Sequence, residues 1–315
     1  MTCPADRPGI RIAFLVLGIS CIPFLNTRSA QSVGSGDFRL TRQIDPGLVG
    51  LIALAVGPGD EIVAVGATEL AIHDSMGQFV RRFRLPSRAR SVAVAKDGTM
   101  YVAMNQSIHV YDPAGSAVES WGDRGSGRGQ FGLLTSLAIT NDFIYIADAG
   151  NRRIHRFAIN GDFIDEFAEK DDSLGEEGLI VPSPYLDLTI DAKGRLLHAN
   201  PGRFRIEIRD AGGTLLRKWG RWGQDPAGFC GCCNPTNLAV FPDGRVVTSE
   251  KGIPRIKIHD AQGHMIQLLD TESIPAGSSG LDLAVDSHDN LYVVEPTRGL
   301  ILVYQEEVRR NDETQ

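Results

Sequence analysis

Apolar and polar residues alternate along this chain in short runs, and the runs recur in six similar segments. Each segment has an apolar run, a turn, a second run, a polar turn and a third run. In most segments a second turn ending in glycine and a fourth run follow, for example at residues 163–167. The first runs contain Ala55-Val56, Ala93-Val94, Ala138-Ile139, Thr189-Ile190, Ala239-Val240 and Ala284-Val285, at spacings of 38, 45, 51, 50 and 45 residues. Turns such as Lys96-Asp97-Gly98 supply the positive φ that tight hairpins require. Four short strands per segment of this length predict the blades of a β-propeller.

The two ends of the repeat region predict how the ring closes. The sixth segment lacks a fourth run, and Gly36-Asp37-Phe38 near the N-terminus matches Gly161-Asp162-Phe163, where the fourth run of another segment begins. We therefore predict an all-β fold: a six-bladed β-propeller with four antiparallel strands per blade. Residues 37–44 should pair with residues 300–304, because this pairing removes the open edge of the ring.

The third blade carries a family resemblance. Its segments GSGRGQF (125–131), IYIADAGNRRIHRF (144–157) and NGDF (160–163) resemble an NHL repeat, and the resemblance covers about residues 37–304. It implies a six-bladed propeller. It implies little about activity, because NHL-like propellers include protein-binding modules, RNA-binding modules and a few metal-dependent lyases.

The N-terminal segment has the pattern of a signal peptide. Arg7 and Arg11 precede a mostly apolar run over residues 12–25, which is too short for a comfortable membrane span. We predict a signal peptide at 1–32, the propeller at 33–304 and a polar tail at 305–315, with export to the periplasm or the extracellular space. A lipid anchor on Cys21 and an uncleaved N-terminal anchor are the less favoured alternatives.

Charge and composition narrow the classes of partner. The 315 residues include 32 Lys and Arg against 39 Asp and Glu, a net charge of −7. Without residues 1–32 the balance is 29 against 38, or −9. An acidic body argues against nucleic acid and against anionic lipid. No later stretch has 18 apolar residues in a row, so we expect no membrane insertion of the mature body, and we expect a monomer.

The residue that ends each second run should lie on the face that carries the loops leading into the first strands, here named the inlet face. These residues are Gly66, Met104, Asp148, Asn200, Glu250 and Glu295. One interpretation is that the polar members brace their own blade, paired with arginines that follow a few residues later. The other is a Ca²⁺ or Mg²⁺ site formed by Asp148, Asn200, Glu250 and Glu295, which would resemble the inner site of gluconolactonase-type propellers.

The fifth inlet loop contains every cysteine of the predicted mature chain: Cys230, Cys232 and Cys233, in the segment FCGCCNP (229–235). It should contact the loop TSEKG (248–252), which includes Lys251, because both loops emerge on one face. The combination resembles a subset of exported bacterial NHL-like proteins with a Gly-Cys-Cys-Asn-Pro loop. We expect one disulfide and one remaining thiol in an oxidising compartment.

Several roles for this loop stay open. A Cys230–Cys233 bridge would be relaxed. A Cys232–Cys233 bridge would be strained, because adjacent Cα atoms lie about 3.8 Å apart whereas disulfides usually need about 4.4–6.8 Å. The loop could be a staple, a rigid platform in a ligand pocket, a thiolate site for copper, zinc or an Fe–S centre, or a thiol–disulfide exchange site. Trp222 near the loop could line a ligand pocket or pack at the rim.

Two functional hypotheses follow from these features. The first is a binding or scaffold module that recognises a protein, peptide or glycan across the inlet face. The second is a metal- or thiol-dependent enzyme, lactonase- or lyase-like, with the cysteine loop and the polar residues of that face as its active site. The sequence does not decide whether the protein is an enzyme.

Overall fold

The computed structural model describes residues 36–173, 175–269, 271–272 and 274–307. The predicted signal peptide at 1–32, with Cys21, and the tail residues 308–315 lie outside the described residues. Within the described residues no helix is long and apolar enough to cross a membrane.

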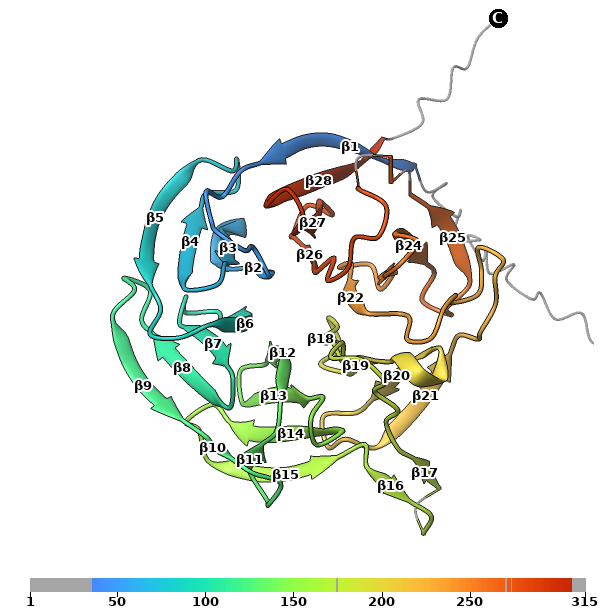
Figure 1. The fold of residues 1–315 in the computed structure, drawn as a ribbon, viewed down its shortest axis with the longest axis horizontal. Coiled ribbons are helices and arrows are strands. Elements are labelled where there is room, and N and C mark those ends of the chain that lie inside the picture. The colour runs from blue at the N-terminus through green and yellow to red at the C-terminus, as the bar shows by residue number, and fades with distance from the viewer. Residues whose placement is uncertain (1–35, 174, 270, 273, 308–315) are drawn as a thin grey trace, which may run out of the picture. The chain divides into compact units, whose positions relative to one another are not determined.

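Six antiparallel four-stranded sheets surround a central axis and form a six-bladed propeller (Figure 1). The innermost strands are β2 (Ala53–Val56), β6 (Ala89–Val94), β12 (Leu134–Ile139), β18 (Leu188–Ile190), β22 (Asn237–Val240) and β26 (Leu283–Val285). The second strands are β3 (Ile62–Val65), β7 (Met100–Met104), β13 (Phe143–Asp148), β19 (Leu196–Asn200), β23 (Val246–Glu250) and β27 (Leu291–Glu295). The third strands are β4 (Glu69–His73), β8 (Ser107–Tyr111), β14 (Arg153–Ala158), β20 (Arg205–Arg209), β24 (Arg255–His259) and β28 (Leu300–Glu307). The outer strands are β5 (Phe79–Arg84), β9 (Ala117–Trp121), β15 (Phe163–Phe167), β21 (Leu215–Trp219), β25 (Met265–Leu268) and β1 (Asp37–Ile44).

Short elements decorate the blades. Two ribbons extend outward in Figure 1, one of parallel and one of antiparallel strands. They are β10 (Asp123–Arg124) with β11 (Gln130–Phe131), and β16 (Lys170–Asp171) with β17 (Glu176–Glu177); the 3₁₀ turns are η1 (Pro58–Asp60) and η2 (Pro201–Arg203).

The N-terminal strand closes the ring, as predicted. β1 pairs antiparallel with β28, from Asp37 opposite Glu307 to Ile44 opposite Ile301. β28 continues to Glu307, beyond the boundary at residue 304 expected from the sequence, because β1 offers it a partner along that length. Phe38 of β1 is 3% exposed and packs against Phe241 with ring centroids 5.1 Å apart.

The core lies between neighbouring blades, around the second strands. All five residues of β7, β19, β23 and β27 are buried. Apolar clusters join adjacent blades: one contains Val63 and Ile72 of the first blade with Val92 and Val102 of the second. Each blade is thus stabilised mainly by burial against the next blade.

Glycines in the turns before the outer strands allow close contact between blades. Gly263 has φ +88, and a Cβ atom there would lie 2.4 Å from the ring of Trp219 in the preceding blade. A Cβ atom at Gly213 would likewise lie 2.5 Å from the ring of Phe167. A larger residue would be strained at this positive φ and its Cβ would clash with the aromatic ring, so these turns require glycine.

Candidate functional site

The propeller axis contains two neighbouring cavities. The inner cavity has a volume of about 250 Å³ and is lined by the six innermost strands. The outer cavity has a volume of about 380 Å³ and is lined by the loops that lead into those strands, so it opens on the inlet face. Ser91 and Asp282 line both cavities. The two cavities are therefore neighbours along the axis.

Small polar side chains form a ring where the innermost strands begin. They are Ser91, Ser136, Asp187, Asn237 and Asp282, and the first blade has Ala53 at the equivalent position. Four of the side chains accept a hydrogen bond from a backbone N–H of the next blade. The pairs are Ser91 with Leu137 (3.2 Å), Ser136 with Leu188 (3.3 Å), Asp187 with Leu238 (2.8 Å) and Asp282 with Leu54 (2.9 Å). This inner ring links blade to blade and brings two carboxyl groups into the channel.

The two channel carboxyls are poor acids. Burial raises the pKa of Asp187 to about 6, although bonds from Ser136 and two backbone N–H groups oppose it. Burial, with repulsion from Asp187, raises the pKa of Asp282 to about 8. Asn237 lies between their blades and donates to Asp282 at 3.2 Å. Near neutral pH the pair holds a proton, which makes one carboxyl a hydrogen-bond donor.

Two arginines stand at the mouth of the outer cavity. Arg88 and Arg90 come from the start of the second blade, and both line the cavity together with Tyr185. Among the described residues neither arginine has an ion-pair partner, and the Nε atom of Arg90 is buried without a hydrogen-bond acceptor. Lys251 adds a further cation nearby, because its Nζ lies 5.0 Å from the Tyr185 ring centroid. The mouth is positively charged in an otherwise acidic protein.

The polar residues at the ends of the second strands brace the inlet loops. Asp148 accepts bonds from the N–H groups of Gly132 (2.8 Å) and Leu133 (2.9 Å) in its own blade. Glu250 accepts from the Cys230 N–H at 2.8 Å. Burial would raise the pKa of Asp148, but its bonds to His155 and to backbone N–H groups outweigh this and lower it to about 2. Loop bracing was the first of the two interpretations drawn from the sequence.

The partners of these bracing residues differ from the arginines that the sequence indicated. Of these residues, only Glu295 forms an ion pair with the arginine expected from the sequence: Arg298 Nε lies 3.0 Å from its carboxylate. Asp148 instead contacts His155 at 3.3 Å, and Glu250 pairs with Lys257 at 2.5 Å. These partners lie seven residues after the acid, on the facing third strand, where both side chains point into the same blade interior.

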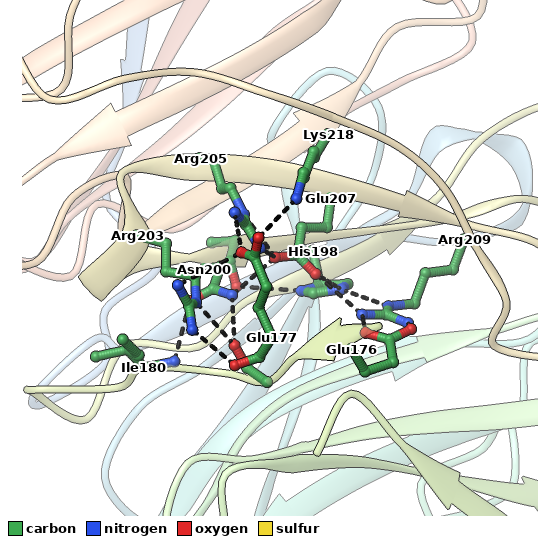
Figure 2. Close-up of polar contacts among 12 residues, drawn as sticks. Glu176, Glu177, Ile180, His198, Asn200, Arg203, Arg205, Glu207, Arg209 and Lys218 are labelled. Carbon is green, nitrogen blue, oxygen red and sulfur yellow. Dashed lines mark hydrogen bonds and ion pairs between the residues drawn. The ribbon is translucent and has the colours of Figure 1, made fainter. Parts of the chain in front are cut away.

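Asn200 belongs to a buried polar network in the fourth blade (Figure 2). Its side chain accepts from the Ile180 N–H at 3.0 Å and donates to Glu207 at 2.8 Å. Arg209, only 1% exposed, binds Glu207 at 3.0 Å and Glu176 of β17 at 2.7 Å. The network thus holds the β16–β17 ribbon against the blade.

His198 in this network is neutral. Burial lowers its pKa to about 4, although Glu207 acts in the opposite direction. Its Nε2 accepts a bond from Arg209 Nε at 3.0 Å, which requires an unprotonated Nε2. Figure 2 shows the side chains of this network in contact with one another. None of them lines either axial cavity.

No metal site emerges from the predicted ligands. Asp148, Asn200, Glu250 and Glu295 each bond within their own blade and do not line the axial cavities. In the part of the chain that the structure describes, no group of three or more His, Cys, Asp or Glu side chains could hold a metal ion.

The cysteine loop and the Lys251 loop lie in contact. Asn234 accepts from the Lys251 N–H at 2.9 Å and so joins the two loops. Cys233 is 1% exposed whereas Cys232 is exposed, and their Sγ atoms lie 2.9 Å apart. All three cysteines of the loop, Cys230 included, are free thiols in this structure.

The two neighbouring thiols differ in acidity. Burial acts to raise the pKa of Cys233, but Cys232, Lys251 and Ser183 outweigh it and leave that pKa below its ordinary value. The hydrogen bond with Cys233 raises the pKa of Cys232. Cys233 is therefore the better thiolate of the pair.

Trp222 does not lie at the axial site. Its side chain is 57% exposed and its backbone forms an isolated bridge with Phe229. It lines neither axial cavity.

The sequence analysis missed the residues that line the axial cavities. The inner ring had a clear signal, since each member lies two positions before the alanine or threonine of a first run. Arg88, Arg90 and Tyr185 recur in no other blade, and no repeat pattern distinguishes them.

Comparison with known proteins supports the fold alone. No protein-family model matches this chain, and no curated protein matches its sequence. The fold is similar to a streptogramin B lyase structure, with a TM-score of 0.58 and 13% identity, over 86% of this chain and 98% of that one. A catalytically inactive variant of virginiamycin B lyase from Staphylococcus aureus with quinupristin gives a TM-score of 0.56 and 14% identity, over 87% and 90%. A protein of unknown function from Bacteroides thetaiotaomicron gives 0.61 and 14%, over 86% and 72%. The class of protein is thus a six-bladed β-propeller, and its activity does not follow from these neighbours.

Proposed function

We propose that this propeller is a binding module, exported from the cytoplasm, that takes a small carboxylate-bearing ligand into the axial cavity on its inlet face. The observation that carries the proposal is the pair Arg88 and Arg90. Both line the cavity mouth, and neither has an ion-pair partner among the described residues.

The arginine pair differs from the buried arginine of the fourth blade. Arg209 is neutralised by Glu176 and Glu207. A buried donor without a partner costs about 1–3 kcal/mol, and more when it is charged. A ligand carboxylate would supply the missing acceptor for Arg90, and the guanidinium fork suits a carboxylate better than a neutral group.

The size of the site points to a small ligand or to one end group of a larger one. The outer cavity of about 380 Å³ lies at the low end of the range of about 300–1,000 Å³ for ligand pockets. A peptide or glycan partner would enter through an acidic end group. At neutral pH the protonated Asp282 at the cavity floor can donate to such a group rather than repel it.

The proposal can be tested by calorimetric titration with acetate, glutarate and citrate, against Arg90→Gln and Arg88→Gln. We expect at least one di- or tricarboxylate to bind, and each substitution to weaken that binding by about 10-fold or more, since a charged hydrogen bond contributes about 1.5–3 kcal/mol. Arg124→Gln is the matched control, because Arg124 is exposed on β10, outside the axial cavities. Equal binding by all three variants, or no carboxylate binding at about 10 mM, contradicts the proposal.

A second candidate is an enzyme that uses the same cavity. The observation that favours it is the carboxyl pair Asp187 and Asp282, whose raised pKa values suit general acid and base roles near neutral pH. Two of the similar solved structures are lyases, which is compatible with this candidate but does not select it. Asp282→Asn should abolish turnover and retain ligand binding if the site is catalytic. A binding module predicts no conversion of the bound carboxylate by either protein.

The proposed location rests on the pattern of residues 1–32. Fusion of residues 1–35 to a reporter that is active only after export tests it. A reporter that stays in the cytoplasm contradicts it.

A further inference from the structure

The cysteine loop holds two neighbouring thiols with different access to solvent. The Sγ atoms of Cys232 and Cys233 lie 2.9 Å apart. Cys232 is exposed, and Cys233 is 1% exposed. The third cysteine, Cys230, uses its backbone: its N–H donates to Glu250 and its carbonyl accepts from Asn234. The geometry thus singles out one pair of sulfur atoms.

The surroundings of the buried thiol favour its ionised form. Lys251 and Ser183 act to lower the pKa of the Cys233 thiol, and Lys251 Nζ lies 2.9 Å from Ser183 Oγ. The backbone of Lys251 is fixed to the cysteine loop through Asn234. A cation held beside a thiol stabilises the thiolate and makes the sulfur a better nucleophile at neutral pH.

We propose that Cys232 and Cys233 form a redox-active dithiol that is oxidised to a disulfide by exchange with a low-molecular-weight disulfide. Cys232 is the thiol that meets the oxidant because it is exposed whereas Cys233 is buried. Cys233 is the nucleophile of the second, resolving step.

The exchange has two balanced steps. The Cys232 sulfur, as thiolate, attacks one sulfur of the oxidant, whose S–S bond breaks and releases a thiolate. The Cys233 thiolate then attacks the Cys232 sulfur of this mixed disulfide, forms the Cys232–Cys233 bond and expels the second thiolate. The two protons of the dithiol pass to the released thiolates, and the two electrons reduce the oxidant to two thiols.

Adjacent cysteines make the reaction reversible. Their Cα atoms are separated by one peptide unit, about 3.8 Å in the trans form, which is below the usual disulfide range of about 4.4–6.8 Å. A disulfide formed under this constraint is strained and is more easily reduced than a structural one. The pair therefore suits repeated oxidation and reduction rather than permanent cross-linking.

The test uses the full chain with Cys3→Ser, Cys21→Ser and Cys230→Ser, so that only the pair remains. After incubation with glutathione disulfide, mass spectrometry should show the loss of two hydrogens, reversed by dithiothreitol. A further Cys233→Ser change should trap a stable adduct with one glutathionyl group on Cys232. A further Cys232→Ser change should slow adduct formation at least ~10-fold, because the remaining thiol is buried.

Two results would overturn the proposal. One is equal rates of adduct formation in the two single-thiol variants. The other is a stable glutathionyl adduct on the Cys232–Cys233 protein without loss of two hydrogens. Differential alkylation and peptide mapping of the unmodified chain give an independent measurement that needs no substitution. A Cys230–Cys233 linkage in that experiment also contradicts the assignment, and a Cys232–Cys233 linkage supports it.

Discussion

Replacing Asp187 with asparagine should stabilise the protein, and the gain should grow with pH. The side chain is 7% exposed, and burial raises its pKa from 3.8 to about 6. Between these pH values the unfolded chain loses its proton before the folded chain does, so folding loses about 1.36 kcal/mol for each pH unit. The cost is absent below pH 3.8 and levels off near pH 6 at about 3 kcal/mol.

Asparagine removes this cost and keeps the contact. Its side-chain oxygen can accept the Leu238 N–H, which lies 2.8 Å from the Asp187 carboxylate. Loss of the charge also relieves the repulsion that helps to raise the pKa of Asp282. The substitution therefore separates the effect of the buried charge from that of the link between blades.

Urea denaturation followed by tryptophan fluorescence measures the effect. The free energy of unfolding of Asp187→Asn should exceed that of the unmodified protein by about 1 kcal/mol at pH 4.5 and by about 3 kcal/mol at pH 8. Asp123→Asn on the exposed strand β10 is the control and should change little at either pH. A variant that is less stable at pH 8, or that gains equally at both pH values, would refute the reasoning.

Three further substitutions test other parts of the structure. Phe38→Ala in the closing strand should lower the free energy of unfolding by about 3–5 kcal/mol in urea denaturation, whereas the same change at Phe79, which is 58% exposed, should cost far less. Gly263→Ala should lower the melting temperature by several degrees, because the new Cβ would lie 2.4 Å from Trp219 in a backbone with positive φ; an unchanged melting temperature would show that the contact is not tight. Glu207→Gln should lower the free energy of unfolding by about 2 kcal/mol at pH 7, because hydrogen bonds from Asn200 and Arg205 outweigh the effect of burial and the pKa of Glu207 falls from 4.5 to about 2. This stability is present above pH 4.5 and is lost as the pH falls toward 2, so a Gln variant with the same deficit at pH 3 would contradict it.

The fold could be predicted because every blade repeats one pattern under the same constraint. Period-two apolar runs recur in all six segments, a turn that ends in glycine follows the third run in five of them, and the repeated strands bury their apolar residues between neighbouring blades. The closing strand was visible because Asp37-Phe38 copies the start of an outer strand in another blade. These features are local, so sequence is enough to reveal them.

The axial site was harder to predict because it depends on contacts between blades. The acids at the ends of the second strands were candidate ligands because of their position on the inlet face. Their carboxylates, however, are bound by backbone N–H groups and by partners such as His155 and Lys257. Arg88 and Arg90 look like ordinary surface residues in the sequence. Only the closed ring places them over a shared cavity.

The pairing of β1 with β28 also determines when the ring can close during synthesis. β1 ends at Ile44 and β28 begins at Leu300, so the first strand made must wait for the last. At about 5–20 residues per second, a ribosome needs roughly 13 to 50 s to supply the intervening stretch. Closure of so long a loop also carries an entropic cost of about 5 kcal/mol beyond a constant term. During that interval β1 has no partner strand and the sixth blade is incomplete, and a chain that terminates before residue 300 lacks the strand with which β1 pairs. A premature stop anywhere upstream of β28 should therefore yield an open arc of sheets and not a smaller ring.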